Sequence, residues 1–392
     1  MKRPGLRARC RELPPACFAP VMATGIVSKA LAQVGVRPVS LLLYGIATAL
    51  YLALLAATGL KAACHPDAVR CELGTPARLF GHFTLVAASG VLASRLDHGP
   101  ARVAACALLA FAGGVWTALA RAAARLVRPG AGGVLRQADG TWFLATVGLQ
   151  SLVITGATLY PGRVALAAAL ALWATGVLLY LATLTAVIRR LWHAPPPPAG
   201  LAPSYWITMG AAAISTLAGG VLLGHLGLLP RPARTPLTAT VVALWSWATV
   251  LIPFLLAAGV WRHRRHRVPL GYEPALWSIV FPAGMYATAT ARLVATHHIG
   301  TAAAAQHPLA WTALAAWLTV TACRLRRQLP SPACWTSRCG LGGRPELLCH
   351  DGCARGPAPG GGGRGILPDR RREPCRGRRR LGRPPGRRGT AG

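Results

Sequence analysis

The sequence has few acidic residues: Asp and Glu together number ten among 392 residues, against 43 Lys and Arg. Charged residues make up only 14% of the chain, whereas hydrophobic residues make up 53%. This composition is too apolar for an ordinary soluble enzyme and indicates a protein whose solvent is lipid. The formal net charge of +33 reflects missing acids as much as abundant bases, so we expect no nucleic-acid partner.

The patterns of several enzyme and metal-site classes are also missing. The sequence contains no Gly-x-x-x-x-Gly-Lys-Ser/Thr loop, which argues against ATP-driven pumping by this chain alone. No serine–histidine or paired-carboxylate set indicates a membrane-embedded enzyme. We therefore expect no catalytic residue, no cofactor and no metal. Cysteines without metal-ligand spacing are interpreted as small apolar side chains: Cys10, Cys17, Cys64, Cys71, Cys106 and Cys323.

Ten apolar stretches are each long enough to cross a bilayer, which takes about 20 helical residues. Polar or Pro/Gly-rich segments separate them. The sequence therefore predicts an all-α membrane protein with ten transmembrane helices. The predicted spans are residues 17–35, 39–60, 79–96, 103–120, 142–160, 164–188, 204–224, 237–260, 275–296 and 306–323.

Basic residues alternate between the two sides that these spans define. One set of connections, which includes both ends of the predicted bundle, holds 21 Lys and Arg residues, and the other set holds six. Lys and Arg concentrate in short cytoplasmic loops. We therefore expect a multi-pass protein of the plasma membrane with both termini in the cytoplasm.

Three regions follow from these patterns. Residues 1–12 form a basic cytoplasmic N-terminus, and residues 13–327 form the transmembrane domain. Residues 328–392 are rich in Arg, Gly and Pro and cannot bury enough apolar surface to fold, so we expect disorder there. Cysteines in this tail surround His350, but their irregular spacing does not predict a zinc site: Cys334, Cys339, Cys349 and Cys353.

Small and hydroxyl-bearing residues gather in the odd-numbered spans. Such residues either let helices pack closely or line a polar path through the membrane. Their recurrence in five spans favours the second interpretation and suggests an inner ring of odd spans. The candidate pore-lining residues are Thr24, Gly25, Ser28, Ser89, Gly90, Gln150, Gly210, Ser215, Pro282 and Gly284.

Ionisable residues inside the predicted spans are rare. No Asp or Glu lies in the middle of a span, and this absence favours an anion path lined by neutral dipoles over a cation path or a carboxylate proton relay. Lys29 either extends to the outer surface or faces the pore. His82 is either a residue of the cytoplasmic mouth or a hydrogen-bonded core histidine. Arg292 either attracts anions or anchors its helix at the interface.

Five segments carry a family resemblance. They are Phe18-Ala-Pro-Val-Met-Ala-Thr-Gly-Ile-Val-Ser28, Phe80-Gly-His-Phe-Thr-Leu-Val-Ala-Ala-Ser-Gly90, Gly140-Thr-Trp-Phe-Leu-Ala-Thr-Val-Gly-Leu-Gln-Ser151, Ser204-Tyr-Trp-Ile-Thr-Met-Gly-Ala-Ala-Ala-Ile-Ser215 and Pro274-Ala-Leu-Trp-Ser-Ile-Val-Phe-Pro-Ala-Gly-Met-Tyr286. The chain thereby resembles the tellurite-resistance/C4-dicarboxylate transporter family, which includes malate and sulfite transporters and slow anion channels.

The resemblance implies five helical hairpins around a central pore that odd-numbered helices line, with assembly as a homotrimer. It also implies a phenylalanine gate, for which Phe281, just before Pro282, is the matching position. Our first hypothesis for function is passive or gradient-driven movement of small anions such as tellurite, sulfite, nitrate, halides or dicarboxylates. Proton-coupled transport of C4-dicarboxylates such as malate is the alternative. A membrane scaffold whose basic tail binds nucleic acid or lipid is a third hypothesis of another class.

Overall fold

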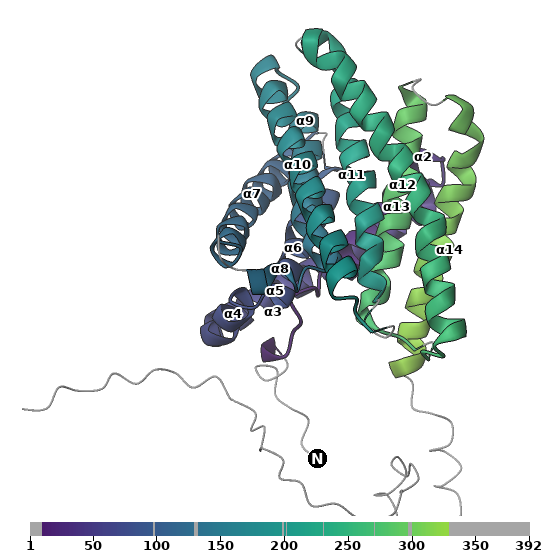
Figure 1. The fold of residues 1–392 in the computed structure, drawn as a ribbon. Helices are drawn as coiled ribbons and strands as arrows, with labels where there is room; N and C mark the ends of the chain where they lie inside the picture. Colours follow the sequence, from purple (N-terminus) through teal and green to yellow (C-terminus); the bar gives the residue numbers. More distant parts are fainter. Residues whose placement is uncertain are drawn as a thin grey trace, which may run out of the picture. The chain divides into compact units, whose positions relative to one another are not determined.

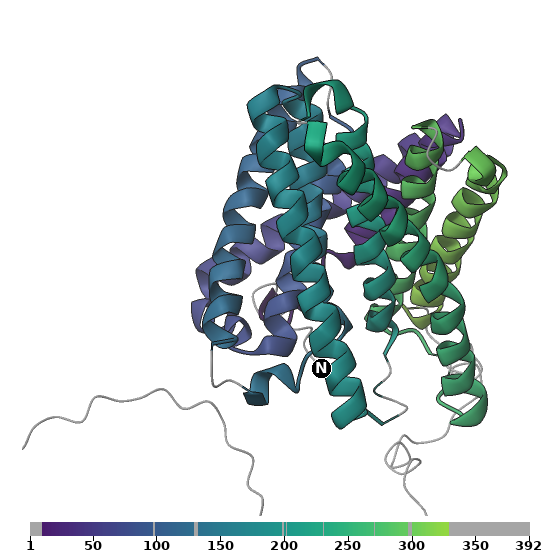
Figure 2. The ribbon, with the colours of Figure 1, turned by 45° about the horizontal axis from the view of Figure 1, so that its top comes forward.

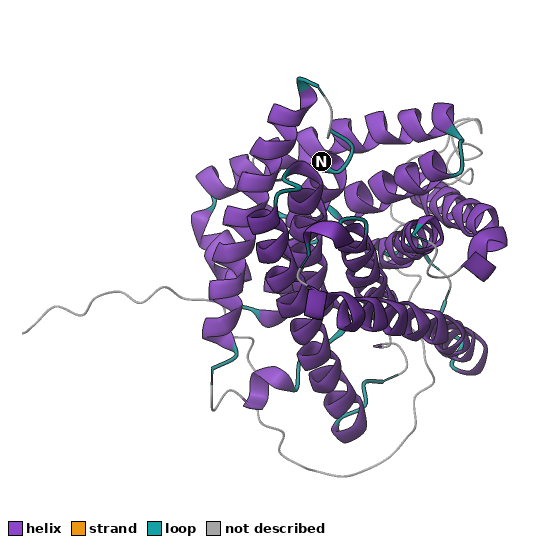
Figure 3. Cartoon of the chain, turned by 90° about the horizontal axis from the view of Figure 1, so that it is seen from above, coloured by secondary structure: helices purple, strands orange, loops and turns teal. Residues whose placement is uncertain are grey.

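The computed structural model describes residues 10–96, 99–128, 132–197, 200, 202–229, 231–269, 271–296 and 300–328. The chain divides into two compact units, Met1–Pro330 and Ser331–Gly392, and the description below concerns the first. Helices and loops account for all of the described backbone (Figure 3). The predicted disorder of residues 328–392 falls almost wholly outside the described residues.

Each of the ten predicted spans contains a helix of 11 residues or more, and Figure 1 labels these helices. Six of the described helices are long and apolar enough to cross a membrane: α3, α7, α9, α10, α11 and α12, with the short turns before α9 and α11 included. The other four are shorter, such as α6 with 11 residues, or less apolar. The bounds are α2 Ala19–Gln33, α3 Arg37–Cys64, α6 Phe83–Ala93, α7 Ala101–Leu126, α9 Leu144–Leu159, α10 Arg163–His193, α11 Trp206–Leu223, α12 Arg231–Arg265, α13 Trp277–Ala295 and α14 Gln306–Gln328.

Short helical elements occupy the connections. The connection between the predicted spans 39–60 and 79–96 folds into α4 Pro66–Leu73 and α5 Pro76–Leu79, each with a proline in its first turn, where the missing N–H costs nothing. Lys61, which directly follows the predicted span 39–60, lies in the last turn of α3 and is buried. The remaining elements are α8 Gly132–Leu135, η1 Phe80–His82, η2 Gly140–Phe143, η4 Pro203–Tyr205, η5 Leu226–Leu228, η6 Pro274–Leu276 and η7 Gly300–Ala305.

Five helices, α2, α6, α9, α11 and α13, form a closed cycle of contacts in which each packs on the next and α13 packs on α2. We call them the ring helices. The helix that follows each one along the chain packs against it: α3, α7, α10, α12 and α14 are these outer helices (Figure 2). In α9 and α11, 83% and 89% of the residues in the apolar stretch are buried. In α3, α7, α10 and α12 the buried share of this stretch is only 17–33%. The ring helices thus form the core, and the outer helices present apolar sides outward.

Small residues set the spacing of the ring. A Cβ atom added at Gly210 would lie 2.8 Å from Cγ of Pro282, and one added at Gly90 would lie 2.7 Å from Cβ of Ser151. Real Cβ atoms do not approach other heavy atoms so closely, so these positions admit only glycine without a shift of the backbone. Close approach through small residues is how membrane helices gain van der Waals contact in the absence of a hydrophobic driving force.

Candidate functional site

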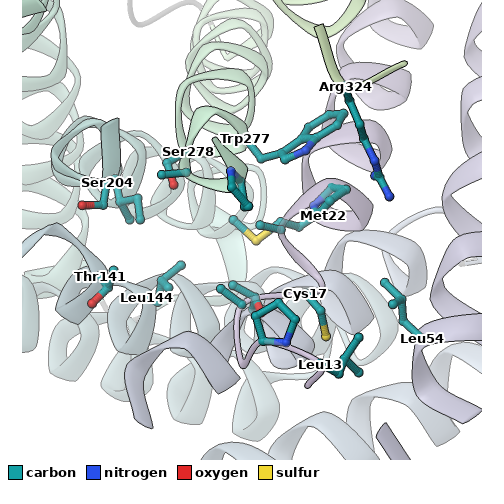
Figure 4. A pocket seen from close by; sticks show the side chains of 18 of the residues that line it. Leu13, Cys17, Met22, Leu54, Thr141, Leu144, Ser204, Trp277, Ser278 and Arg324 are labelled. Carbon is teal, nitrogen blue, oxygen red and sulfur yellow. The ribbon is translucent and has the colours of Figure 1, made fainter. Parts of the chain in front are cut away.

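A cavity of about 620 Å³ lies at one end of the ring, and we call it the vestibule. Every ring helix contributes residues from its N-terminal end, so the five helices run in the same direction away from the vestibule. Figure 4 shows Thr141, Ser204 and Ser278 on one side of it and Leu13 and Cys17 on another. The ring-helix residues that line it are Ala19, Pro20, Met22, Thr84, Leu144, Ile207, Trp277 and Ser278, with Thr141, Ser204, Pro274 and Ala275 from the preceding turns.

A five-residue pattern recurs where each ring helix begins. Its fourth position is always Phe or Trp, its second is small or carries a hydroxyl, and its fifth lines the vestibule in all five copies. Neighbouring copies touch: a Cβ atom on Gly140 would collide with the backbone of Ser204 in the next copy. The copies are Pro15-Ala-Cys-Phe-Ala19, Phe80-Gly-His-Phe-Thr84, Gly140-Thr-Trp-Phe-Leu144, Pro203-Ser-Tyr-Trp-Ile207 and Pro274-Ala-Leu-Trp-Ser278.

This repeat can be seen in the sequence, but the predicted site residues were not chosen from it. Most of the predicted pore-lining residues lie deeper in the spans, whereas the vestibule is lined by the first turns of the ring helices and by the short turns that precede them. Thr84, Thr141, Ser204 and Ser278 were therefore not among the candidates, although all four line the cavity. When the five segments are aligned on their shared aromatic residue, the fifth position of each copy is a residue that lines the vestibule.

The vestibule favours negative charge. Helix N-termini carry a partial positive charge, and five of them converge here. Arg324 and Arg327 of α14 line the same cavity, and Arg327 donates to the carbonyl of Tyr272 at 2.9 Å. No Asp or Glu is found among the described lining residues. The cavity is therefore an electropositive chamber with hydroxyl groups that can solvate a small anion.

The predicted gate residue, Phe281, is completely buried on α13. It lies about one helical turn beyond Trp277 and Ser278, which line the vestibule. Met22 on α2 also lines the cavity and is 1% exposed. Phe281 is not among the described lining residues, so its role as a gate stays a prediction.

The predicted pore-lining residues with polar side chains bond mainly to outer helices. Thr24 accepts a hydrogen bond from Nε1 of Trp317 on α14 at 2.9 Å. Ser28 donates to the carbonyl of Ser40 on α3 at 2.7 Å. The hydroxyl of Ser89 lies 2.8 Å from that of Tyr51 on α3. Gln150 donates to the carbonyl of Trp173 on α10 at 3.1 Å. Ser215 is the exception, because it donates within α11 to the carbonyl of Ala211 at 2.8 Å.

The predicted glycines and proline lie at contacts between ring helices. Gly210 faces Pro282, and Gly90 faces Ser151, as described above. A Cβ atom on Gly25 would lie 2.7 Å from Cγ1 of Val91 on α6. The structure thus brings the small residues together as ring contacts, and most of the polar ones bond the ring to its outer helices. A role for any of them in lining an open pore stays a prediction.

The three ionisable residues singled out in the spans all make contacts with neighbouring elements. Lys29 donates to Oγ of Ser94, just after α6, at 3.1 Å. Arg292 donates through Nε to the carbonyl of Gly220 on α11 at 3.0 Å. His82 lies with Nε2 3.4 Å from Oε2 of Glu72.

Two relatives of the chain are named as membrane proteins or transporters. An uncharacterized membrane protein of Mycobacterium tuberculosis is 40% identical over 148 residues, which is 36% of this chain and 73% of the relative. An uncharacterized transporter of Methanocaldococcus jannaschii is 24% identical over 160 residues, which is 38% of this chain and 44% of the relative. Residues 12–325 match the family described as voltage-dependent anion channel. This match covers all but the last two residues of the predicted membrane domain, 13–327, and confirms the resemblance seen in the sequence: the chain belongs to the voltage-dependent anion channel family of membrane transporters and channels.

Proposed function

We propose that this chain conducts small anions across the plasma membrane through the centre of its ring helices. The observation that carries the proposal is the vestibule, an electropositive chamber that five helix N-termini, hydroxyl groups and two arginines surround. Oriented dipoles and neutral hydroxyls stabilise a partly dehydrated anion without binding it so tightly that it cannot leave. The substrates are small inorganic or dicarboxylate anions, and all ten long helices cross the bilayer.

In this proposal Phe281 is the gate. Its ring is buried about one helical turn beyond Trp277 and Ser278, which line the vestibule, so we expect an anion that leaves the vestibule to meet apolar side chains. A hydrophobic constriction excludes water and thereby stops ions. Rotation of one aromatic side chain is enough to open such a constriction, and no covalent chemistry or cofactor takes part.

Anion flux through Phe281→Ala tests the gate. Proteoliposomes that contain this variant should release chloride or nitrate about tenfold faster than those with the parent chain, because removing the ring removes the dehydrated layer. Phe143→Ala is the matched control: Phe143 is also fully buried, but its ring packs 5.3 Å from that of Tyr180 on an outer helix. An equal flux in the Phe281 variant and the parent, with both folded, would refute the gate.

Proton-coupled transport of dicarboxylates is the second candidate, and one observation favours it. Lys61 and Glu72 form a buried ion pair, and Nε2 of the half-buried His82 lies 3.4 Å from Oε2 of Glu72. Leu13 and Cys17 line both the small cavity beside these residues and the vestibule, so a proton bound there would add positive charge next to the anion path. A pH-jump assay separates the two candidates, since a channel moves anions without a fixed number of protons.

Cytoplasmic termini and assembly as a homotrimer complete the proposal. The excess of basic residues in alternate connections supports this orientation, and the family resemblance supports the trimer. The scaffold hypothesis predicts that the chain binds nucleic acid or lipid through residues 328–392 and moves no anion. Deleting that segment distinguishes them, because a transporter retains its flux.

A further inference from the structure

A second cavity, of about 550 Å³, lies among the ends of α11, α12, α13 and α14 and shares Tyr272 with the vestibule. Its walls are mainly apolar, with Leu255 and Ala258 from α12, Ile279 from α13 and Val320 from α14. α12 packs on α11 and α14 packs on α13, but no comparable contact joins α12 to α14 in the described part of the chain. The cavity therefore fills a gap between two outer helices, whose apolar sides face the bilayer.

Polar groups gather at one end of this cavity. Arg262 lies in the last turn of α12 and is only 8% exposed. Its guanidinium lies 3.5 Å from Oε1 of Glu273, in the connection between α12 and α13, which is a long contact for a charged pair. The Nε atom of Arg262 and the hydroxyl of Tyr205 are both buried and have no hydrogen-bond partner among the described residues.

Unpartnered buried donors are costly, and a buried guanidinium is more costly than a hydroxyl. The Nε–H group of Arg262 is therefore available to donate a hydrogen bond to an anion at the polar end of the cavity. Three exposed basic residues follow Arg262 along the chain and add positive charge to this region: Arg264, Arg265 and Arg267. Basic pockets between membrane helices on the cytoplasmic side suit anionic lipid headgroups.

The order of residues along α12 matches the order of groups in a phospholipid. Leu255 and Gly259 come first, deeper in the predicted span, and Arg262 follows at its end, about 10 Å further along the helix axis from Leu255. We propose that this cavity binds an anionic phospholipid, with its phosphate on Arg262 and one acyl chain between α12 and α14. The inference needs only that the chain lies in a membrane, and it does not rest on anion conduction.

Gly259 offers a sharp test because it lines the cavity and nothing lies within 4 Å of a Cβ atom added there. Gly259→Trp should fill the cavity without a backbone clash. Gly45→Trp is the matched control, since Gly45 also has open space around its Cβ position but lies on α3, away from the cavity. Arg262→Gln removes the charge, and Arg264→Gln, at an exposed position outside the cavity lining, controls for net charge.

The measurement is native mass spectrometry of the full-length protein with phosphatidylglycerol, phosphatidylcholine of the same acyl chains, or free glycerol phosphate. Phosphatidylglycerol should bind about fivefold more tightly than phosphatidylcholine, because a nearby Arg adds about that factor for an anionic headgroup. Arg262→Gln should weaken its binding about tenfold, Gly259→Trp should abolish it, and both controls should retain it.

Three results would overturn the inference. They are equal binding of the two lipids, unchanged phosphatidylglycerol binding in Gly259→Trp, and binding of glycerol phosphate as tight as that of the lipid. If another segment of this chain or a second copy fills the cavity, no lipid binds there, and the oligomeric state of Gly259→Trp reveals a second copy. Anion flux plays no part in the readout, so failure of the pore proposal leaves the lipid result interpretable.

Discussion

The Nζ atom of Lys61 lies 2.7 Å from Oε1 of Glu72, and both side chains are buried. The same ammonium group donates to the carbonyl of Leu13 at 2.7 Å. This pair therefore joins the end of α3, the short helix α4 and the segment before α2. Because Leu13 lines the vestibule, the pair holds one wall of the chamber in place.

Glu72→Ala should destabilise the protein by about 3–5 kcal/mol, because it leaves the Lys61 charge buried without its partner. Asp67→Ala is the control, since Asp67 pairs with Arg70 on the exposed side of the same helix at 2.8 Å and exposed pairs contribute little. Thermal unfolding in detergent measures both. Equal losses in the two variants would show that burial of the Lys61 pair does not matter.

Arg324→Gln should lower anion flux about fivefold at low ionic strength, because Arg324 lines the vestibule and concentrates anions there. Salt screens this attraction, so the difference should shrink as ionic strength rises. Arg326→Gln, two positions along α14 and exposed, should leave the flux unchanged. A flux deficit of the same size in both variants would point to a general loss of charge and away from the chamber.

Gly210→Ala should cost about 1–3 kcal/mol, because the new methyl group would lie 2.8 Å from Cγ of Pro282 and overpack the contact of α11 with α13. Gly45→Ala, where nothing lies within 4 Å, should be neutral or slightly stabilising, since Ala favours a helix more than Gly. The comparison is made by unfolding in detergent. A neutral Gly210→Ala would mean that the ring can widen at this contact.

Single cysteines should report the orientation of the chain. With the other cysteines replaced by serine, Cys64 at the end of α3 should react with a membrane-impermeant thiol reagent in inside-out vesicles. A cysteine introduced as Arg163→Cys, at the start of α10, should react in right-side-out vesicles. Labelling of both positions from one side would contradict the expected crossing of the membrane between them.

Much of the fold was predictable because helix length and apolarity are local properties. The span predicted at 204–224 corresponds to α11 at Trp206–Leu223 with its preceding turn. The least predictable region followed α3, where Pro66 and Pro76 start short helices that a hydropathy pattern does not show. The burial of Lys61 was not predictable either, because its pair with Glu72 depends on a contact between separate elements.

The candidate site was harder to predict, because sequence alone does not say which way a polar side chain on a helix points. Thr24 and Gln150 were expected to face a path, yet their hydrogen bonds run to Trp317 and to the carbonyl of Trp173 on outer helices. A tryptophan N–H buried in an apolar layer needs an acceptor, and the hydroxyl of Thr24 supplies one. The role of Phe281 as a gate likewise stays a prediction, because burial of its ring alone does not show that it blocks a path.

All five ring helices begin at the vestibule and run away from it, so the two mouths of the proposed pore are electrically unlike. One mouth gathers five positive dipole ends, and the opposite mouth gathers the negative ends. An anion that starts from the vestibule therefore meets a different energy profile from one that starts at the far mouth. With identical salt on both sides, current through such a pore rectifies, and the current–voltage curve bends even though no voltage-sensing charge moves.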